Sequence, residues 1–127
     1  MPTNVTPQYN PVQVKGPGGV GVFDNVAAVS AGGFFSVALR NDGTVWVWGS
    51  GFFGQLGNGT TDIPSVTPVQ VKGPGGVGFL ANVVAISASQ NHVLALRNDG
   101  TVWAWGRNQW GQLGNGTTTD ANSPVQV

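Results

Sequence analysis

The sequence contains no cysteine, no glutamate and little charge of either sign. Without cysteine there is no disulfide framework, no thiolate metal site and no cysteine nucleophile. Five Lys and Arg side chains balance five acidic ones, so no field of one sign favours a nucleic acid or an anionic membrane as partner. Only 8% of the residues are charged, against ~25% in typical soluble domains. Solubility therefore depends on uncharged polar groups or on coverage by other protein.

A long apolar segment and a helical pattern are also missing. No apolar run approaches the ~20 residues that a membrane-spanning helix needs, and the first residues lack the charged and apolar regions of a signal peptide. We therefore expect no membrane contact. Twenty-one glycines and eight prolines interrupt every window that has apolar residues at helical spacing. The expected fold class is all-β.

What the sequence does contain is a long internal repeat. Residues 11–59 align without a gap with residues 68–116, and 33 of these 49 pairs are identical. The segment SPVQV at the end of the sequence begins a third copy. Similarity at a fixed period indicates a repeat architecture, in which each unit buries its faces against a neighbour.

Each repeat contains four short segments with the pattern of β-strands. They are residues 25–31, 36–40, 44–49 and the segment PVQV, which occurs at 11–14, 68–71 and 124–127. Asp-Gly in the turn after residue 40 is expected to supply the positive φ angles of a tight hairpin. Four short strands per repeat predict two four-stranded blades of a β-propeller. The predicted ranges are 1–24 for an N-terminal segment with an edge strand and linker, 25–71 for blade 1, 72–82 for a linker and 83–127 for blade 2.

The two copies carry a family pattern. VSAGGFFSVALRNDGTVWVWGSGFFGQLGNG and ISASQNHVLALRNDGTVWAWGRNQWGQLGNG resemble the repeat of the regulator of chromosome condensation family, in the manner of bacterial tandem arrays. The resemblance covers residues 11–127 and depends above all on W-G followed by G-Q-L-G. It implies a β-propeller, usually of seven blades, that is used mostly to bind proteins. The family's histidine is His92 but is replaced by Phe35, and its asparagine is Asn108 but is replaced by Gly51.

The best-known member of that family is a nucleotide-exchange factor for a small GTPase that also binds nucleosomes. This sequence has nothing that matches the inserted wedge or the basic tail which that activity implies. A GTPase nucleotide-exchange factor is therefore the third and weakest hypothesis. It predicts accelerated nucleotide release.

Two blades alone would leave apolar faces in water, which favours association. We expect either further repeats in a longer chain or further copies of this one to complete a ring. Three copies would supply six blades and four would supply eight. The sequence has three PVQV segments but two copies of every other strand, so one edge strand would be surplus in a ring of identical chains. This count favours an excerpt from a longer array.

The repeats differ mainly in two loops, and loops on a rigid scaffold often carry binding. Drift at tolerant surface positions would give the same pattern. The candidate interface or ligand-binding residues are Phe34, Phe35, Phe52, Phe53, Asn91, His92, Arg107, Asn108, Gln109 and Trp110. The four phenylalanines are too many rings for a solvated loop, so they are expected to seal a blade interface or to meet a partner. His92 is the only histidine and makes no metal site alone, so a structural role is expected.

No set of residues predicts catalysis. Asp42 and Asp99 have a conformational role in turns, and no Ser–His–Asp order is indicated. GPGGVG lacks the Gly-Lys-Ser/Thr of a phosphate-binding loop and is expected to be a flexible link.

We therefore expect a non-enzymatic interaction and assembly module with no cofactor and no metal. Its blade faces would drive self-association or packing within a longer array. The alternative is a lectin-like module that binds a glycan through Trp110, Asn108 and Gln109, because a ring beside polar donors suits both protein hot spots and sugars. Low charge, absent cysteine and loops rich in Thr and Asn favour a secreted or bacterial cell-surface origin.

Overall fold

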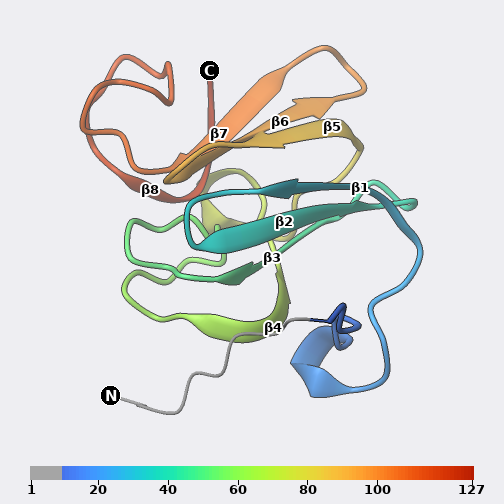
Figure 1. Cartoon of the computed structure of the whole chain (residues 1–127). Coiled ribbons are helices and arrows are strands. Elements are labelled where there is room, and N and C mark those ends of the chain that lie inside the picture. The colour runs from blue at the N-terminus through green and yellow to red at the C-terminus, as the bar shows by residue number, and fades with distance from the viewer. Residues whose placement is uncertain (1–9) are drawn as a thin grey trace.

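The computed structural model of the protein describes residues 10–127, which form two four-stranded antiparallel sheets, one above the other in Figure 1. Blade 1 contains β1 (Val26–Ala31), β2 (Phe35–Arg40), β3 (Val45–Gly49) and β4 (Ser65–Gln70), and blade 2 contains β5 (Val83–Ala88), β6 (His92–Arg97), β7 (Val102–Gly106) and β8 (Ala121–Gln126). In each sheet the strands lie in chain order. The described residues include no α-helix. The predicted all-β class and the two blades are confirmed.

Some strand bounds differ from the predicted ones. Asn25 and Asn82 precede their strands and have positive φ angles of 57° and 62°, which short polar side chains tolerate. The last strand of each blade begins earlier than PVQV, since Ser65 pairs with Gly49 and Ala121 pairs with the corresponding glycine of β7. In the hairpin after β2, Gly43 has a positive φ of 81° but Asp42 does not.

The first PVQV segment, residues 11–14, is not a strand, so the prediction of a third edge strand was wrong. In the two blades PVQV pairs with the preceding Trp-x-Trp strand, where Gln70 lies opposite Trp46 and Gln126 lies opposite Trp103. No Trp-x-Trp segment precedes residues 11–14 in this sequence. Each blade thus has its own complete set of four strands, and residues 11–14 lie outside both sets.

The GPGGVG segments, which we predicted to be flexible links, are hydrogen-bonded turns. Each contains one 3-10 turn, η1 (Pro17–Gly19) and η2 (Pro74–Gly76). The ends of the second segment meet where Gly73 N donates to Gly78 O at 2.9 Å, and the β-bridge between Lys72 and Phe79 flanks it. The chain therefore reverses at this point and enters blade 2 through a defined turn.

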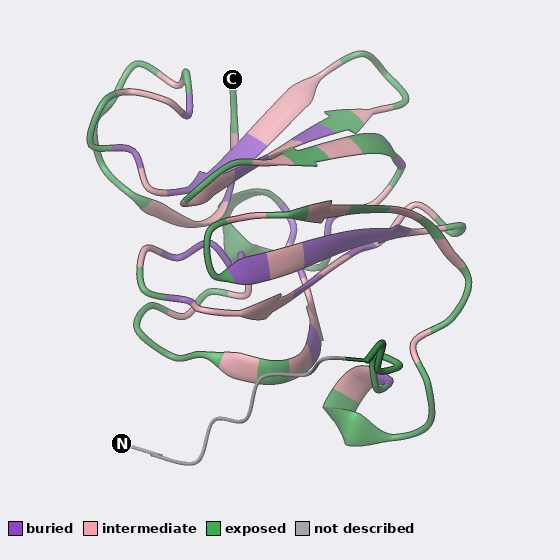
Figure 2. Cartoon of the chain, in the orientation of Figure 1, coloured by how far each residue is buried: buried purple, intermediate pink, exposed green. Residues whose placement is uncertain are grey.

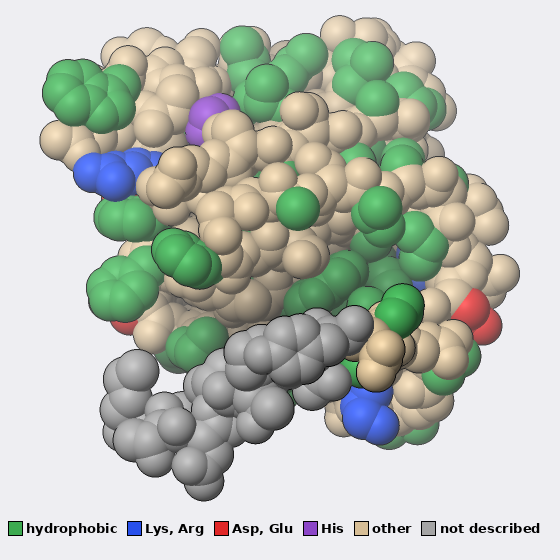
Figure 3. Space-filling model, in the orientation of Figure 1, with side chains coloured by type: hydrophobic (Ala, Val, Ile, Leu, Met, Phe, Trp, Pro, Cys, Tyr) green, Lys and Arg blue, Asp and Glu red, His purple; other side chains and the backbone are tan. Residues whose placement is uncertain are grey.

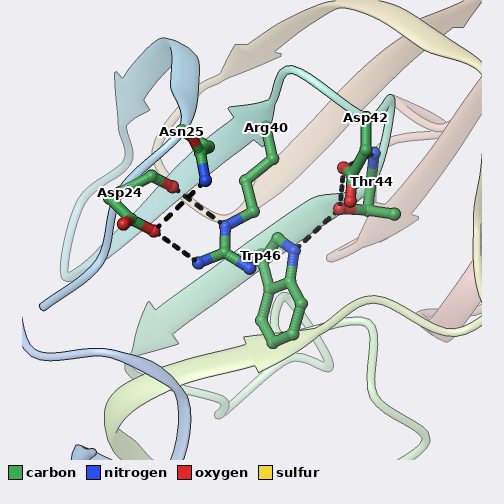
Figure 4. Close-up of polar contacts among 6 residues, drawn as sticks. All are labelled: Asp24, Asn25, Arg40, Asp42, Thr44 and Trp46. Atoms are coloured by element: carbon green, nitrogen blue, oxygen red, sulfur yellow. Dashed lines mark hydrogen bonds and ion pairs between the residues drawn. The ribbon is translucent and has the colours of Figure 1, made fainter. Parts of the chain in front are cut away.

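An arginine, a tryptophan, a threonine and an aspartate support the β2–β3 hairpin of blade 1 (Figure 4). The guanidinium of Arg40 lies 5.1 Å from the ring centroid of Trp46, and its Nε donates to Asp24 O at 3.1 Å. The indole of Trp46 donates to Thr44 Oγ1 at 2.9 Å, and that hydroxyl donates to Asp42 Oδ1 at 2.6 Å. The same set recurs in blade 2 with Arg97, Asp99, Thr101 and Trp103. These contacts explain why the R-N-D-G-T-V-W segment is identical in the two repeats.

The hydrophobic core lies between the two blades, as the buried strand segments in Figure 2 indicate. Alternate residues of β2 contribute Phe35, Val37 and Leu39 to one cluster, which also contains Val83 and Val93 of blade 2. Trp105 is the largest fully buried side chain, and its indole donates to Gln55 O of blade 1 at 3.0 Å. The blades are therefore held together by a shared core and not by a tether alone.

Candidate functional site

Four loops meet at one end of the two sheets. The loops β1–β2, β3–β4, β5–β6 and β7–β8 lie at the left in Figure 1, opposite the β2–β3 and β6–β7 hairpins. A groove of about 380 Å³ lies among the first three of these loops. This loop groove is lined by Phe34, Ser50, Phe52, Phe53, Gln55, Gln90 and Asn91. Four of the ten candidate residues therefore come together in a groove that both blades build.

A cation lies beside the loop groove. The Arg107 guanidinium lies 4.5 Å from the centroid of the Phe53 ring, which is a cation–π distance. Its Nη2 also donates to Gln109 Oε1. Within the described part of the chain the ion pair is that of Arg40 with Asp24, so Arg107 has no acidic partner there. Arg107 thus brings an uncompensated positive charge to the aromatic wall of the groove.

Large rings project from these loops into solvent. Phe34 is 83% exposed, Phe52 67% and Trp110 81%. Figure 3 shows hydrophobic side chains along the left side of the molecule with a basic side chain among them. Exposed rings grouped in this way are typical of a contact surface for another molecule.

The invariant glutamine of GQLG holds the backbone from which these rings project. The side-chain Oε1 of Gln55 accepts a hydrogen bond from Phe53 N at 2.6 Å, and Oε1 of Gln112 accepts one from Trp110 N at 2.9 Å. Gln55 is almost fully buried. An identical glutamine thus positions a different ring in each repeat.

Asn108 is a structural residue, since its side chain is completely buried. Its Nδ2 lies 2.9 Å from Thr117 O and 3.0 Å from Thr119 O, and its Oδ1 accepts from Leu113 N at 3.0 Å. The amide therefore closes the β7–β8 loop from inside. It is not available to a ligand.

Gly51 closes the corresponding loop of blade 1 without a side chain. Its carbonyl accepts from Asp62 N at 3.0 Å. A Cβ at Gly51 would lie 2.5 Å from Ile63 O, which leaves no room for an asparagine. The difference between the repeats at this position is therefore two ways of closing one loop.

Phe35 and His92 occupy equivalent positions and differ in burial. Phe35 is 4% exposed and belongs to the core between the blades, which is one of the two roles predicted for the phenylalanines. His92 is half-buried, and its Nδ1 lies 2.8 Å from Ser89 Oγ. Burial lowers the pKa of His92 from its usual 6.5 and favours the neutral ring. Among residues 10–127 no three metal-ligating side chains gather in one place.

The predicted site residues thus divide into two groups. Phe34, Phe52, Phe53 and Asn91 line the groove, Arg107 stacks on the Phe53 ring, and Gln109 and Trp110 are exposed on the same loop as Arg107. Phe35 and Asn108 lie inside the scaffold, and the half-buried His92 contacts Ser89 there. Ser50, Gln55 and Gln90 also line the groove but were not predicted. Gln55 is identical in the two repeats, so their differences gave no signal for it.

In the part of the chain that the structure describes, no helix has the length and apolar character needed to cross a membrane.

The repeat matches known family models along most of its length. One model of the regulator of chromosome condensation (RCC1) repeat matches residues 42–96 and 99–127, and a second with the same description matches residues 26–55 and 83–112.

The chain spans only a small part of the length of the curated relatives it matches. The chain is 39% identical to the human E3 ubiquitin-protein ligase HERC2 over 102 residues, which is 80% of the chain and 2% of HERC2. It is 37% identical to the Arabidopsis thaliana ultraviolet-B receptor UVR8 over 99 residues, which is 78% of the chain and 21% of UVR8.

Solved structures show the same blades. Human WBSCR16 superposes with a TM-score of 0.69 at 32% identity, over 83% of this chain and 26% of that one. Prp20p of Saccharomyces cerevisiae superposes equally well at 17% identity, over 80% of this chain and 25% of that one, and shows the fold alone. Both the repeat and the blade architecture lead to one conclusion: the chain belongs to the regulator of chromosome condensation repeat family.

Proposed function

We propose that this chain is a non-enzymatic protein-interaction module that binds a protein partner in its loop groove and packs its blade faces against further blades. The observation that carries the proposal is the groove itself, which joins aromatic rings of blade 1 to amides and one cation of blade 2. A groove that needs two blades would be formed only by the assembled repeats. Binding and blade packing are therefore parts of one function.

Protein partners described for a protein with this fold support the proposal that the partner of this chain is also a protein. The described binding partners of Prp20p are Gsp1p and histones, and a further structure has Kap60 bound to Prp20. This chain spans a quarter of Prp20p or less, so its own partner is inferred from its own loops. HERC2 is named as a ligase, but the chain matches 2% of it, and no ligase activity is assigned here.

The chemistry of the groove defines the kind of partner segment that fits. Phe34 and Phe52 supply apolar area, and Gln90 and Asn91 supply amides at the blade 2 side. Arg107 is fixed on the Phe53 ring and is free to pair with a carboxylate. We expect a peptide segment with an apolar or aromatic side chain next to Asp or Glu.

Selection of peptides from a random displayed library against the full chain tests this part of the proposal. We expect enriched peptides to combine an apolar residue with an acidic one. Phe52→Ser and Arg107→Gln should each weaken binding about tenfold, which is the effect of truncating a hot-spot residue. Val66→Ser is the control, because Val66 is 95% exposed on β4 and does not line the groove. The assignment would be contradicted if no peptide were enriched. It would also be contradicted if neither Phe52→Ser nor Arg107→Gln weakened the binding of the enriched peptides.

The exposed indole of Trp110 keeps the lectin-like alternative open. Its predicted polar partners were Asn108 and Gln109, and burial of Asn108 leaves only the second. A glycan ligand would quench tryptophan fluorescence with saturation, and Trp110→Ala would remove the quenching. No response across a glycan panel eliminates this function. Unchanged nucleotide release from small GTPases would likewise eliminate the exchange-factor hypothesis.

A further inference from the structure

Equivalent positions of the two blades differ in burial on one face. In blade 1, Val37 and Leu39 are 0% and 5% exposed, because blade 2 covers them. Their equivalents in blade 2 are more open, since Leu94 is half-buried and Leu96 is 39% exposed. The open face of blade 2 consists of Ala85, Ser87, Leu94, Leu96 and Val102, which line an apolar groove of about 250 Å³.

The junction inside the chain shows what covers such a face. The hydrogen bonds that blade 2 donates to blade 1 include Ala88 N to Ser30 Oγ at 3.0 Å, Trp105 Nε1 to Gln55 O at 3.0 Å and Val83 N to Gly43 O at 3.1 Å. In these three contacts the donors come from one blade and the acceptors from the other. Blade 1 donates in return through Gly33 N to Gln90 O at 3.0 Å and Gly59 N to Asn122 O at 2.9 Å. The two blades contribute different faces to the junction, which therefore has a direction.

The acceptors of that junction recur on the open face of blade 2. Ser87, Gly100 and Gln112 are equivalent to Ser30, Gly43 and Gln55 by the repeat alignment. From Asn10 onward, none of Ser87 Oγ, Gly100 O and Gln112 O accepts a hydrogen bond outside the strand ladders. The blade 2 face thus repeats an acceptor set that has no donor within the described chain.

The donors recur on the opposite, outer face of blade 1. Trp48 is equivalent to Trp105, but its indole N–H has no hydrogen-bond partner among residues 10–127. Ala31 and Val26 are equivalent to the donors Ala88 and Val83. Each unused acceptor on one end of the chain therefore has a matching donor position on the other end.

Apolar groups match as well. Leu80 and Trp105 fill the core between the blades, and their equivalents Phe23 and Trp48 are half-buried on the outer face of blade 1, with ring centroids 5.7 Å apart. Two contacts are not repeated: Asn122 donates to Gly59 O at 3.1 Å but its equivalent is Ser65, and Arg107 stacks on Phe53 but its equivalent is Ser50. The aromatic and hydrogen-bonding parts of the junction are present on both free faces.

We propose that a second copy of this chain docks the outer face of its blade 1 on the open face of blade 2, with the geometry of the junction inside the chain. The proposal rests on the packing part of the proposed function and is independent of the loop groove. Ala31 N of the second copy donates to Ser87 Oγ, and its Trp48 indole donates to Gln112 O. The two surfaces are different, so the contact is head-to-tail and leaves a free face at each end for further copies.

Cysteine cross-linking tests this contact directly, since the sequence has no cysteine of its own. Ser87→Cys chains mixed with Ala31→Cys chains should form a disulfide-linked pair, whereas neither variant alone should. The matched control is Ser30→Cys with Ala88→Cys in one chain, which places the same pair across the known junction. A disulfide between two Ser87→Cys chains, or no mixed pair when the control closes, would overturn the proposal.

A second measurement needs no disulfide. Leu96→Lys places a charge on the open face and should prevent association in light scattering, whereas Val66→Lys on β4 should leave it unchanged. Association that Leu96→Lys does not reduce would also overturn the head-to-tail contact. The peptides selected on the loop groove separate the two proposals, because Ser87, Ala31 and Leu96 do not line that groove. Peptide binding with no self-association would reject only the docking of a second copy.

Discussion

At the residue scale, the residues that differ between the repeats fall into two kinds of structural environment. Asn108 and Gly51 are two ways of closing a loop, one by a buried amide and one by backbone. Phe34, Phe52 and Trp110 instead expose their rings on that closed frame. Variation at the same pair of loops therefore has a structural component and, in our proposal, a recognition component.

Replacement of Asn108 separates these components. Asn108→Ala leaves the Thr117 and Thr119 carbonyls and Leu113 N without their partner, so we expect the free energy of unfolding to fall by about 2–3 kcal/mol. Its exposed neighbour provides the control, and Gln109→Ala should change that free energy by no more than ~0.5 kcal/mol. Urea denaturation measures both. Equal losses for the two variants would contradict a structural role for Asn108.

The sequence indicated which loop residues differ between the repeats but not which of them face inward. Phe35 could have been placed in the core, because it alternates with Val37 and Leu39 along β2 and such residues share one face of a strand. Asn108 carries no comparable local signal. Its partners lie nine and eleven residues away, and only the closed loop brings them together.

At the element scale, the hairpins after β2 and β6 depend on a chain of hydrogen bonds that ends in an aspartate. The indole of Trp46 donates to Thr44 Oγ1, and this hydroxyl donates to Asp42. Hydrogen bonds from Thr44 hold the pKa of Asp42 below its usual 3.8, and those from Thr101 do the same for the pKa of Asp99. The ionised carboxylates thus orient the tryptophans through the threonines.

The lowered pKa values predict the direction of the pH dependence. A carboxyl group whose pKa is lower in the folded state stabilises the fold above its unfolded pKa of ~3.9, and this stability is lost as the pH falls through the folded pKa. Asp42→Ala with Asp99→Ala should therefore lower Tm near neutral pH and reduce the loss of Tm on acidification. Thermal unfolding followed by circular dichroism measures this.

Asp62→Asn is the control for charge, because the Asp62 carboxylate accepts no hydrogen bond in the described part of the chain. An acid-induced loss of Tm that is the same in the control and in the double variant would refute the role of the hairpin carboxylates.

All eight strands of the two blades were predicted from local signals, such as alternation around Trp-x-Trp, and their predicted positions are close to the observed ones. The first PVQV segment was mispredicted because its strand character depends on a distant partner. The second PVQV segment pairs with β3 through residues 69 and 70. The identical segment at 11–14 has no such strand to pair with in the described part of the chain. The GPGGVG turns were missed since their closure depends on backbone hydrogen bonds that composition does not show.

At the scale of the whole molecule, the two blades form one body because blade 2 fills the face of blade 1. Gly57 shows how close the contact is. It has a positive φ of 62°, and a Cβ there would lie 2.8 Å from Trp105 Nε1. The repeat predicted that each blade needs a neighbour. Periodicity alone could not show which face of each blade is covered, or that the two free faces carry opposite halves of the same junction.

The most direct test of the account is the native mass of the unmodified chain, measured by light scattering on a sizing column over a range of concentrations. Complementary free faces predict that the mass rises above the 13.0 kDa of one chain in whole-chain steps. Closure of a ring would give a sharp species at 39 or 52 kDa, three or four times 13.0 kDa. A 13.0 kDa monomer that persists at every concentration and unfolds cooperatively would contradict the claim that the blade faces drive association.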